Sequence, residues 1–157
     1  MSDARSDPRE GLVVTHRRYV PYSHAHYAGN LVDGAYALGL FGDVATEACI
    51  RTDGDEGLFA SYSDVQFKAP MRAGDVLEIT ATVSRIGRRS RVMDFACTVV
   101  CRGDAAAGES AAAVLDPPIV AVTATGTVVV PAPAMPTTAG SAAGLDVPAA
   151  PAPARPR

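Results

Sequence analysis

Apolar residues are nearly continuous between positions 36 and 50, and they alternate with polar residues along several later segments. The apolar residues of the first stretch are Ala37, Leu38, Leu40, Phe41, Val44, Ala45, Ala48 and Ile50. This density predicts a helix that is buried on nearly all sides. Asp33, Asp43 and Glu47 would then lie within about 80° of one another on its surface. Buried carboxylates are costly unless they are paired or functional, so this stripe either faces solvent or lines a site.

The remaining pattern predicts strands. Residues 58–67 alternate clearly, and residues 76–86 and 90–102 flank a Gly-Arg-Arg turn suited to a hairpin. Further strands are expected at 12–19 and 120–130, with a long Gly/Ala/Ser-rich loop at 103–113. Consecutive strands after one helix indicate an antiparallel sheet packed on that helix, which is an α+β architecture.

Composition is that of an ordinary soluble protein. The chain has 157 residues, 48% of them hydrophobic and 20% charged, with a formal net charge of −3. We expect a disordered N-terminus at 1–11, one domain at 12–130, and a disordered Pro/Ala-rich tail at 131–157. The absence of a membrane-length apolar run and of a signal-like N-terminus predicts a cytoplasmic protein without a membrane partner. No basic stripe interleaved with aromatic residues suggests nucleic-acid binding.

The cysteines and histidines give little sign of a nucleophile or a metal site. Cys49, Cys97 and Cys101 are expected to be buried free thiols, because neither a cationic neighbour nor an oxyanion motif accompanies any of them. His24 and His26 lack a second ligand cluster at zinc spacing, so no metal is expected.

Three motifs resemble those of the hotdog-fold superfamily, in which a curled antiparallel β-sheet wraps one long central helix. They are VQFKAP at 65–70, RAGDVL at 72–77 and VSRIGRRS at 83–90. Further motifs are similar to those of one family in that superfamily, the 3-aminoacyl-CoA ammonia lyases, which include 3-aminobutyryl-CoA and β-alanyl-CoA ammonia lyases. These are AHYAGNLVDGA at 25–35, FGDVATE at 41–47, DGD at 53–55 and DPP at 116–118.

The resemblance implies reversible elimination of ammonia from a 3-aminoacyl-CoA to give the 2-enoyl-CoA, without a cofactor other than the coenzyme A of the substrate. Such a reaction needs a base for the α-proton and stabilisation of the enolate at the thioester oxygen. In this fold the carbonyl is expected at the start of the central helix. Gly34, Ala35 and Tyr36 are therefore predicted to bind substrate through N–H groups at the helix N-terminus.

Asp43 and Glu47 are predicted to supply the base, because two like charges one turn apart raise at least one pKa when they are desolvated. Asp33 is a further catalytic candidate that could bind the substrate ammonium group.

In the preceding loop, His26 and Asn30 have two open interpretations each. His26 either handles protons or holds the loop, and Tyr27 is expected to cover the substrate as an aromatic lid. Asn30 either contacts substrate or is the N-cap of the helix, with Asp33 three residues later in a variant capping box.

The phosphates of coenzyme A require cations. Arg88, Arg89 and Arg91 at the predicted hairpin are the candidates, clustered with Arg85 and with Lys68 and Arg72 nearby in sequence. Ordinary solvated arginines at a turn are the alternative. By resemblance, the protein is expected to be a homodimer or a multiple of dimers.

Three alternative functions remain open from the sequence. One is a thioesterase on the same fold, in which Asp43 activates water. Another is amine addition to an enoyl group on an acyl-carrier protein. The last is a non-catalytic module that binds acyl thioesters.

Overall fold

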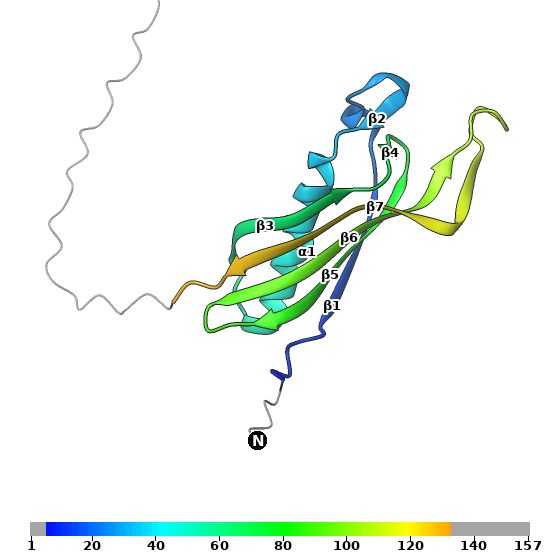
Figure 1. Ribbon diagram of the computed structural model, residues 1–157. Coiled ribbons are helices and arrows are strands. Elements are labelled where there is room, and N and C mark those ends of the chain that lie inside the picture. Colours follow the sequence, from blue (N-terminus) through cyan, green and yellow to red (C-terminus); the bar gives the residue numbers. More distant parts are fainter. Residues whose placement is uncertain (1–5, 133–157) are drawn as a thin grey trace, which may run out of the picture.

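The computed structural model describes residues 6–132, which form one long helix inside a curved sheet (Figure 1). The elements in chain order are β1 (Val13–Tyr19), the 3-10 turns η1 (Tyr22–His24) and η2 (Ala28–Asn30), β2 (Leu31–Val32), α1 (Ala35–Asp53), β3 (Leu58–Phe67), β4 (Met71–Arg72), β5 (Val76–Ile86), β6 (Ser90–Gly103) and β7 (Ala112–Val129).

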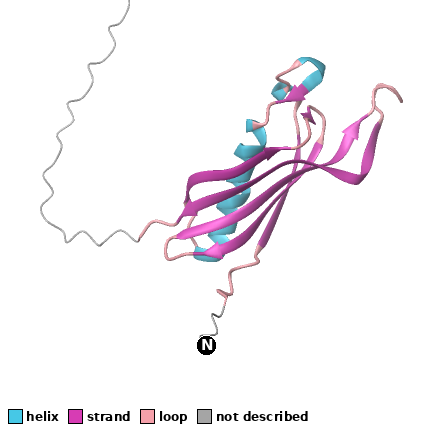
Figure 2. Ribbon diagram, in the orientation of Figure 1, coloured by secondary structure: helices cyan, strands magenta, loops and turns pink. Residues whose placement is uncertain are grey.

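The main sheet has the strand order β1-β5-β6-β7-β3, and every pairing is antiparallel. It curls around α1, while β2 and β4 form a separate two-stranded sheet beside the helix start (Figure 2). The α+β hotdog architecture expected from the sequence is confirmed. The predicted strands 58–67 and 76–86 coincide with β3 and β5.

The helix is amphipathic, which corrects the expectation that it is buried nearly all round. Its fully buried face consists of Ala37, Phe41, Val44, Ala45, Ala48 and Cys49. These side chains pack on the concave side of the sheet, where the Phe41 and Phe95 ring centroids lie 5.1 Å apart. Asp43 and Ile50 face outward and are exposed. The buried stripe is therefore one continuous face, as in an ordinary core-facing helix.

Strand β7 is much longer than predicted, because it begins at Ala112 instead of residue 120. The predicted loop 103–113 is mostly the end of a β6–β7 hairpin, whose tip extends beyond the rest of the sheet in Figure 1. Pro117 and Pro118 lie within β7, although prolines argue against a regular strand. They lie where the β6–β7 register shifts between Val99 and Cys101.

The N-terminal segment is anchored to the domain from residue 7 onward, which corrects the expectation of disorder through residue 11. Arg9 forms ion pairs with Asp7 and with Asp53 at 2.8 and 2.9 Å. The Gly11 N–H donates to the Val83 carbonyl at 2.8 Å. Of the predicted tail 131–157, residues 133–157 lie outside the described residues.

The cysteines are free thiols, as expected, although Cys101 is only half-buried. Burial raises the pKa of Cys49 to about 11 and that of Cys97 to about 12. Neither thiol is therefore ionised to a useful extent near neutral pH.

No helix within residues 6–132 is long and apolar enough to cross a membrane.

Candidate active site

The start of α1 presents two backbone N–H groups without partners. The helix begins at Ala35, with Gly34 at the N-cap position. The Tyr36 N–H donates to Asp33 Oδ1 at 3.1 Å, and the Ala37 N–H donates to the Gly34 carbonyl at 3.2 Å. No hydrogen bond among the described residues uses the N–H of Gly34 or Ala35. Free donors at a helix N-terminus favour an acceptor that carries negative charge.

Asp33 provides the side-chain cap of this helix, which corrects the alternative that Asn30 is its N-cap. Asn30 lies five residues before the helix in a 3-10 turn, with a left-handed backbone at φ 60°. Its carbonyl accepts a hydrogen bond from the Ala73 N–H at 2.9 Å and so connects the loop to the neighbouring segment.

A pocket of about 670 Å³ opens at this helix start, a volume typical of small-molecule sites. The helix start, the loop before it, the segment after β3 and strand β7 all contribute to its wall. The lining residues are His26, Tyr27, Val32, Asp33, Gly34, Ala35, Phe67, Lys68, Ala69, Pro70, Met71 and Val122. Five residues predicted from the sequence therefore meet in one pocket: His26, Tyr27, Asp33, Gly34 and Ala35.

The loop carrying His26 and Tyr27 is closed on itself. The backbone N–H groups of both residues donate to the Leu31 carbonyl, at 2.8 and 3.0 Å. Their rings meet edge to face with centroids 4.5 Å apart. Both side chains are exposed while lining the pocket, so a bound ligand could contact them without rearrangement of the loop.

Phe67 and Lys68 are pocket residues that sequence reasoning did not place there. A Cβ at Gly34 would overlap the Phe67 ring, so this aromatic ring lies directly against the helix start. Phe67 is nevertheless 62% exposed, which is unusual for such a large apolar side chain. Its position at the end of β3 was visible in the sequence, but its neighbour across the fold was not.

Tyr36 does not contribute its side chain to the pocket. Its ring packs on His24 with centroids 4.6 Å apart, and its hydroxyl accepts a hydrogen bond from Arg18 Nε at 3.3 Å. Its N–H is already bonded to Asp33. The predicted substrate contact at Tyr36 is therefore wrong for both the side chain and the N–H.

The structure does not bring Asp43 and Glu47 together with Asp33. Asp43 is exposed and lines a separate groove with His16, Arg17, Arg18, Leu40 and Ile79. The predicted stripe assumed that Asp33 is helical, whereas α1 begins only at Ala35.

The Glu47 carboxylate is occupied by two side-chain partners. His16 and Arg51 both bond its carboxylate, with the Arg51 contact at 2.7 Å, and these hydrogen bonds lower the pKa of Glu47. The rise expected for at least one pKa of the Asp43 and Glu47 pair is therefore not found at Glu47.

Arg91 is not free to bind a phosphate, which corrects its assignment to coenzyme A. It is 4% exposed, and its guanidinium donates to both carboxylate oxygens of Asp53. The same hydrogen bonds hold the pKa of Asp53 below its ordinary value.

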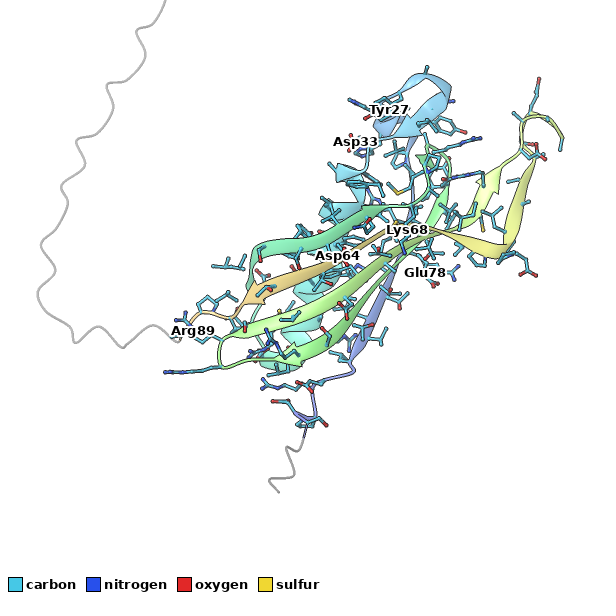
Figure 3. The ribbon with its side chains drawn as sticks, in the orientation of Figure 1. Tyr27, Asp33, Asp64, Lys68, Glu78 and Arg89 are labelled. Atoms are coloured by element: carbon cyan, nitrogen blue, oxygen red, sulfur yellow. The ribbon has the colours of Figure 1, made fainter. Side chains whose placement is uncertain are left out.

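The Arg91–Asp53 pair also fixes the position of the hairpin. Asp53 is the last residue of α1, a helix of 19 residues, which spans about 28 Å. Arg88 and Arg89 therefore lie at the opposite end of the helix from the pocket in the same protomer. Figure 3 shows Asp33 and Arg89 at these two ends.

No group of three His, Cys, Asp or Glu side chains in residues 6–132 is arranged to hold a metal ion.

Comparison with known proteins identifies the family. The chain is 50% identical over 107 residues to the 3-aminobutyryl-CoA ammonia lyase of Acetoanaerobium sticklandii. The aligned region covers 68% of this chain and 85% of that protein. The chain belongs to the hotdog-fold 3-aminoacyl-CoA ammonia lyases. The solved β-alanyl-CoA:ammonia lyase of Clostridium propionicum is 34% identical, with a TM-score of 0.72 over 77% of this chain and 86% of that one.

More distant matches support the fold alone. Residues 29–105 match the family model described as the thioesterase superfamily. A hexameric hotdog-fold thioesterase of Campylobacter jejuni is 18% identical, with a TM-score of 0.60 over 73% of this chain and 79% of that one. The two relatives of higher identity are both named as carbon–nitrogen lyases, so family membership favours lyase chemistry over thioester hydrolysis.

Proposed function

We propose that this chain catalyses the reversible elimination of ammonia from a 3-aminoacyl-CoA thioester in the pocket at the start of α1. The observation that carries the proposal is the meeting of the free Gly34 and Ala35 N–H groups with the Asp33 carboxylate and the His26 ring in one pocket. The named activities of the relatives at 50% and 34% identity support the same reaction.

The thioester oxygen would accept hydrogen bonds from Gly34 and Ala35. Removal of a proton from C2 moves its electron pair toward that oxygen, and the two N–H groups stabilise the developing negative charge. The C3–N bond then breaks, nitrogen leaves with the bonding pair as ammonia, and C2 and C3 become doubly bonded. Addition of ammonia to the enoyl thioester reverses each step.

We assign the ammonium contact to Asp33 and the proton transfer to His26. One oxygen of Asp33 is engaged by the Tyr36 N–H, which fixes the carboxylate and leaves Oδ2 to face the ligand. The imidazole ring can both accept and donate a proton, and His26 lines the pocket where the substrate would lie. This assignment replaces Asp43 and Glu47, which line no part of this pocket.

A second copy of the chain is part of the proposal. Within the described residues β3 pairs only with β7, and its outer edge carries unpaired backbone groups over ten residues. Leu58 and Phe67 at its two ends are 65% and 62% exposed. Long exposed edges favour pairing with another chain, and Phe67 would place that interface beside the pocket. Light scattering is expected to give a dimer or a multiple of dimers, whereas a monomer at micromolar concentration would contradict this part.

The reaction is tested with 3-aminobutyryl-CoA and β-alanyl-CoA in one direction, and with the corresponding enoyl-CoA thioesters plus ammonia in the other. Enoyl absorbance and free thiol are followed together. We expect the enoyl signal to change without thiol release. Thiol release would establish a thioesterase, and activity restricted to thioesters on an acyl-carrier protein would establish the carrier-bound alternative. Ligand binding without turnover of any thioester would indicate a binding module.

The assignment of His26 has a matched control in the same loop. His26→Gln is expected to lower kcat by about 10²–10⁴-fold, as removal of a general base does. His24 does not line the pocket and packs on Tyr36 instead, so His24→Gln is expected to keep the wild-type rate. Equal effects of the two substitutions would remove His26 from the chemistry.

A further inference from the structure

The segment between β3 and β5 is a rigid rim of the pocket. The Lys68 and Ala69 N–H groups both donate to the Ala121 carbonyl, at 2.8 and 3.1 Å. The Ala73 N–H donates to Asn30, and the Arg72 N–H donates to Asp75 Oδ2 at 2.8 Å. Backbone bonds thus fix this segment to β7, to the loop before α1 and to its own following turn.

A buried ion pair helps to hold this rim in place. Asp75 is 1% exposed, and Arg102 donates to both of its carboxylate oxygens at 2.9 and 2.8 Å. Arg102 also donates to the Pro70 carbonyl at 3.0 Å. A bidentate pair with this geometry holds both partners in one orientation. Arg102 is therefore committed to the scaffold and is not a free cation.

The rim carries two cations, Lys68 and Arg72, on opposite sides of the two-stranded sheet formed by β2 and β4. Strand β4 pairs with β2 in the register Val32↔Met71 and Leu31↔Arg72. Val32 and Met71 line the pocket, whereas Arg72 lines a neighbouring cavity of about 280 Å³. Lys68 lies in the pocket wall itself. Three residues lie between the two cations, and the four steps of chain that join them span at most about 14 Å.

Neither cation has a side-chain partner within the part of the chain that the structure describes. Among residues 6–132, the side chains of Lys68 and Arg72 form no hydrogen bond, and no salt bridge includes either residue. Both are exposed. Asp75, Asp104 and Glu109 line the same cavity as Arg72. Arg102 pairs with Asp75, so the carboxylates of Asp104 and Glu109 are the ones that oppose an anion bound there. The expected contribution of each contact is accordingly moderate and sensitive to salt.

We propose that Lys68 and Arg72 bind the phosphates of coenzyme A in the protomer that holds the acyl group. The inference rests on the proposed function, because it takes the acyl thioester to lie at Gly34 and Ala35. A thioester seated there leaves the pocket past Lys68 and along the rim toward Arg72. Figure 3 places Lys68 on the Asp33 side of the molecule and Arg89 at the far end.

The test compares a CoA thioester with the N-acetylcysteamine thioester of the same acyl group, which lacks the phosphates. The measured quantity is the ratio of kcat/KM for the two substrates. Lys68→Met and Arg72→Met are each expected to lower this ratio by about tenfold at low salt, with a smaller effect at high salt. Arg17→Met removes the same charge from an exposed position on β1, outside both cavities, and is the matched control, for which the ratio should not change.

Two results would overturn the proposal. The ratio would fall for Arg88→Met and Arg89→Met but not for the rim variants if the hairpin of a second copy binds the phosphates. Equal losses on both thioesters in the rim variants would place these cations in acyl binding instead of phosphate binding.

Calorimetry with coenzyme A separates this inference from the proposed reaction. If the wild-type protein binds coenzyme A but eliminates no ammonia, the reaction is wrong, while weaker binding by the rim variants still supports the phosphate site. Unchanged binding by those variants would refute the site whatever the reaction is. Dephospho-CoA distinguishes the 3′-phosphate from the diphosphate as the group that they contact.

Discussion

Replacing Asp33 with asparagine separates a helix cap from a substrate contact. In the structure Asp33 Oδ1 accepts the Tyr36 N–H at 3.1 Å, and Asp33 also lines the pocket. Asparagine retains the acceptor and removes the charge. Asp33→Asn is therefore a change in electrostatics at nearly constant shape.

The two roles predict effects of different size. Loss of the interaction between a carboxylate and the helix dipole costs about 0.3–1 kcal/mol, which lowers Tm by only about 1–5 °C for a domain of this size. Loss of a charged hydrogen bond to the substrate ammonium costs about 1.5–3 kcal/mol. That energy corresponds to a decrease in kcat/KM of about 10- to 150-fold.

The assay pairs kcat/KM for a 3-aminoacyl-CoA with a thermal melt, and Asp33→Ala is the second variant. Alanine removes the cap as well as the charge, so its Tm should fall further, by an amount that reflects about 1 kcal/mol of capping energy. Wild-type kcat/KM in the asparagine variant would refute the ammonium contact. A large loss of Tm in the same variant would refute the reasoning that asparagine preserves the cap.

Other substitutions test the remaining features. Asp43→Asn and Glu47→Gln are expected to keep kcat within about threefold of wild type, because neither side chain lines the pocket. A loss of about 10²-fold, the size expected for a general base, would restore them as candidates for the base. Gly34→Ala should displace the Phe67 ring and alter KM with little change in Tm. Gly39→Ala is the control, because nothing lies within 4 Å of its added Cβ, and it should raise the free energy of unfolding by about 0.5–1 kcal/mol. Equal kinetics in both variants would contradict a role for Phe67.

The pH dependence of stability tests the pair at the far end of the helix. Arg91 lowers the pKa of Asp53 in the folded state, so the stabilisation is present above the unfolded pKa of about 3.9 and is lost as the pH falls through the folded value. Asp53→Asn should reduce the free energy of unfolding at pH 7 by about 3–5 kcal/mol, because Arg91 stays buried. Its Tm should also fall less steeply than that of the wild type below about pH 4. Parallel acid profiles would show that Asp53 does not contribute.

Local periodicity determined most of the fold. Alternation over 58–67 and 76–86 reproduces two strands, and the face formed by Ala37, Phe41 and Val44 is buried as the helical period requires. These features depend on neighbours close in the chain, so sequence alone reports them well. The motifs around residues 25–35 also identified the family and located the loop that forms much of the pocket.

Tertiary structure decided which charged groups are available for chemistry. The helix begins at Ala35, which removed Asp33 from the predicted stripe and made it both the cap and a pocket residue. Arg91 and Asp53 are 38 residues apart in the chain, and their ion pair makes Arg91 unavailable for phosphate binding, which the sequence did not indicate. Phe67 and Lys68 lie at the helix start only because β3, the edge strand of the main sheet, ends beside it. Hydrophobic periodicity depends on backbone geometry along one element, whereas ion pairs and pocket walls depend on which elements meet, and the pattern along the chain does not contain that information.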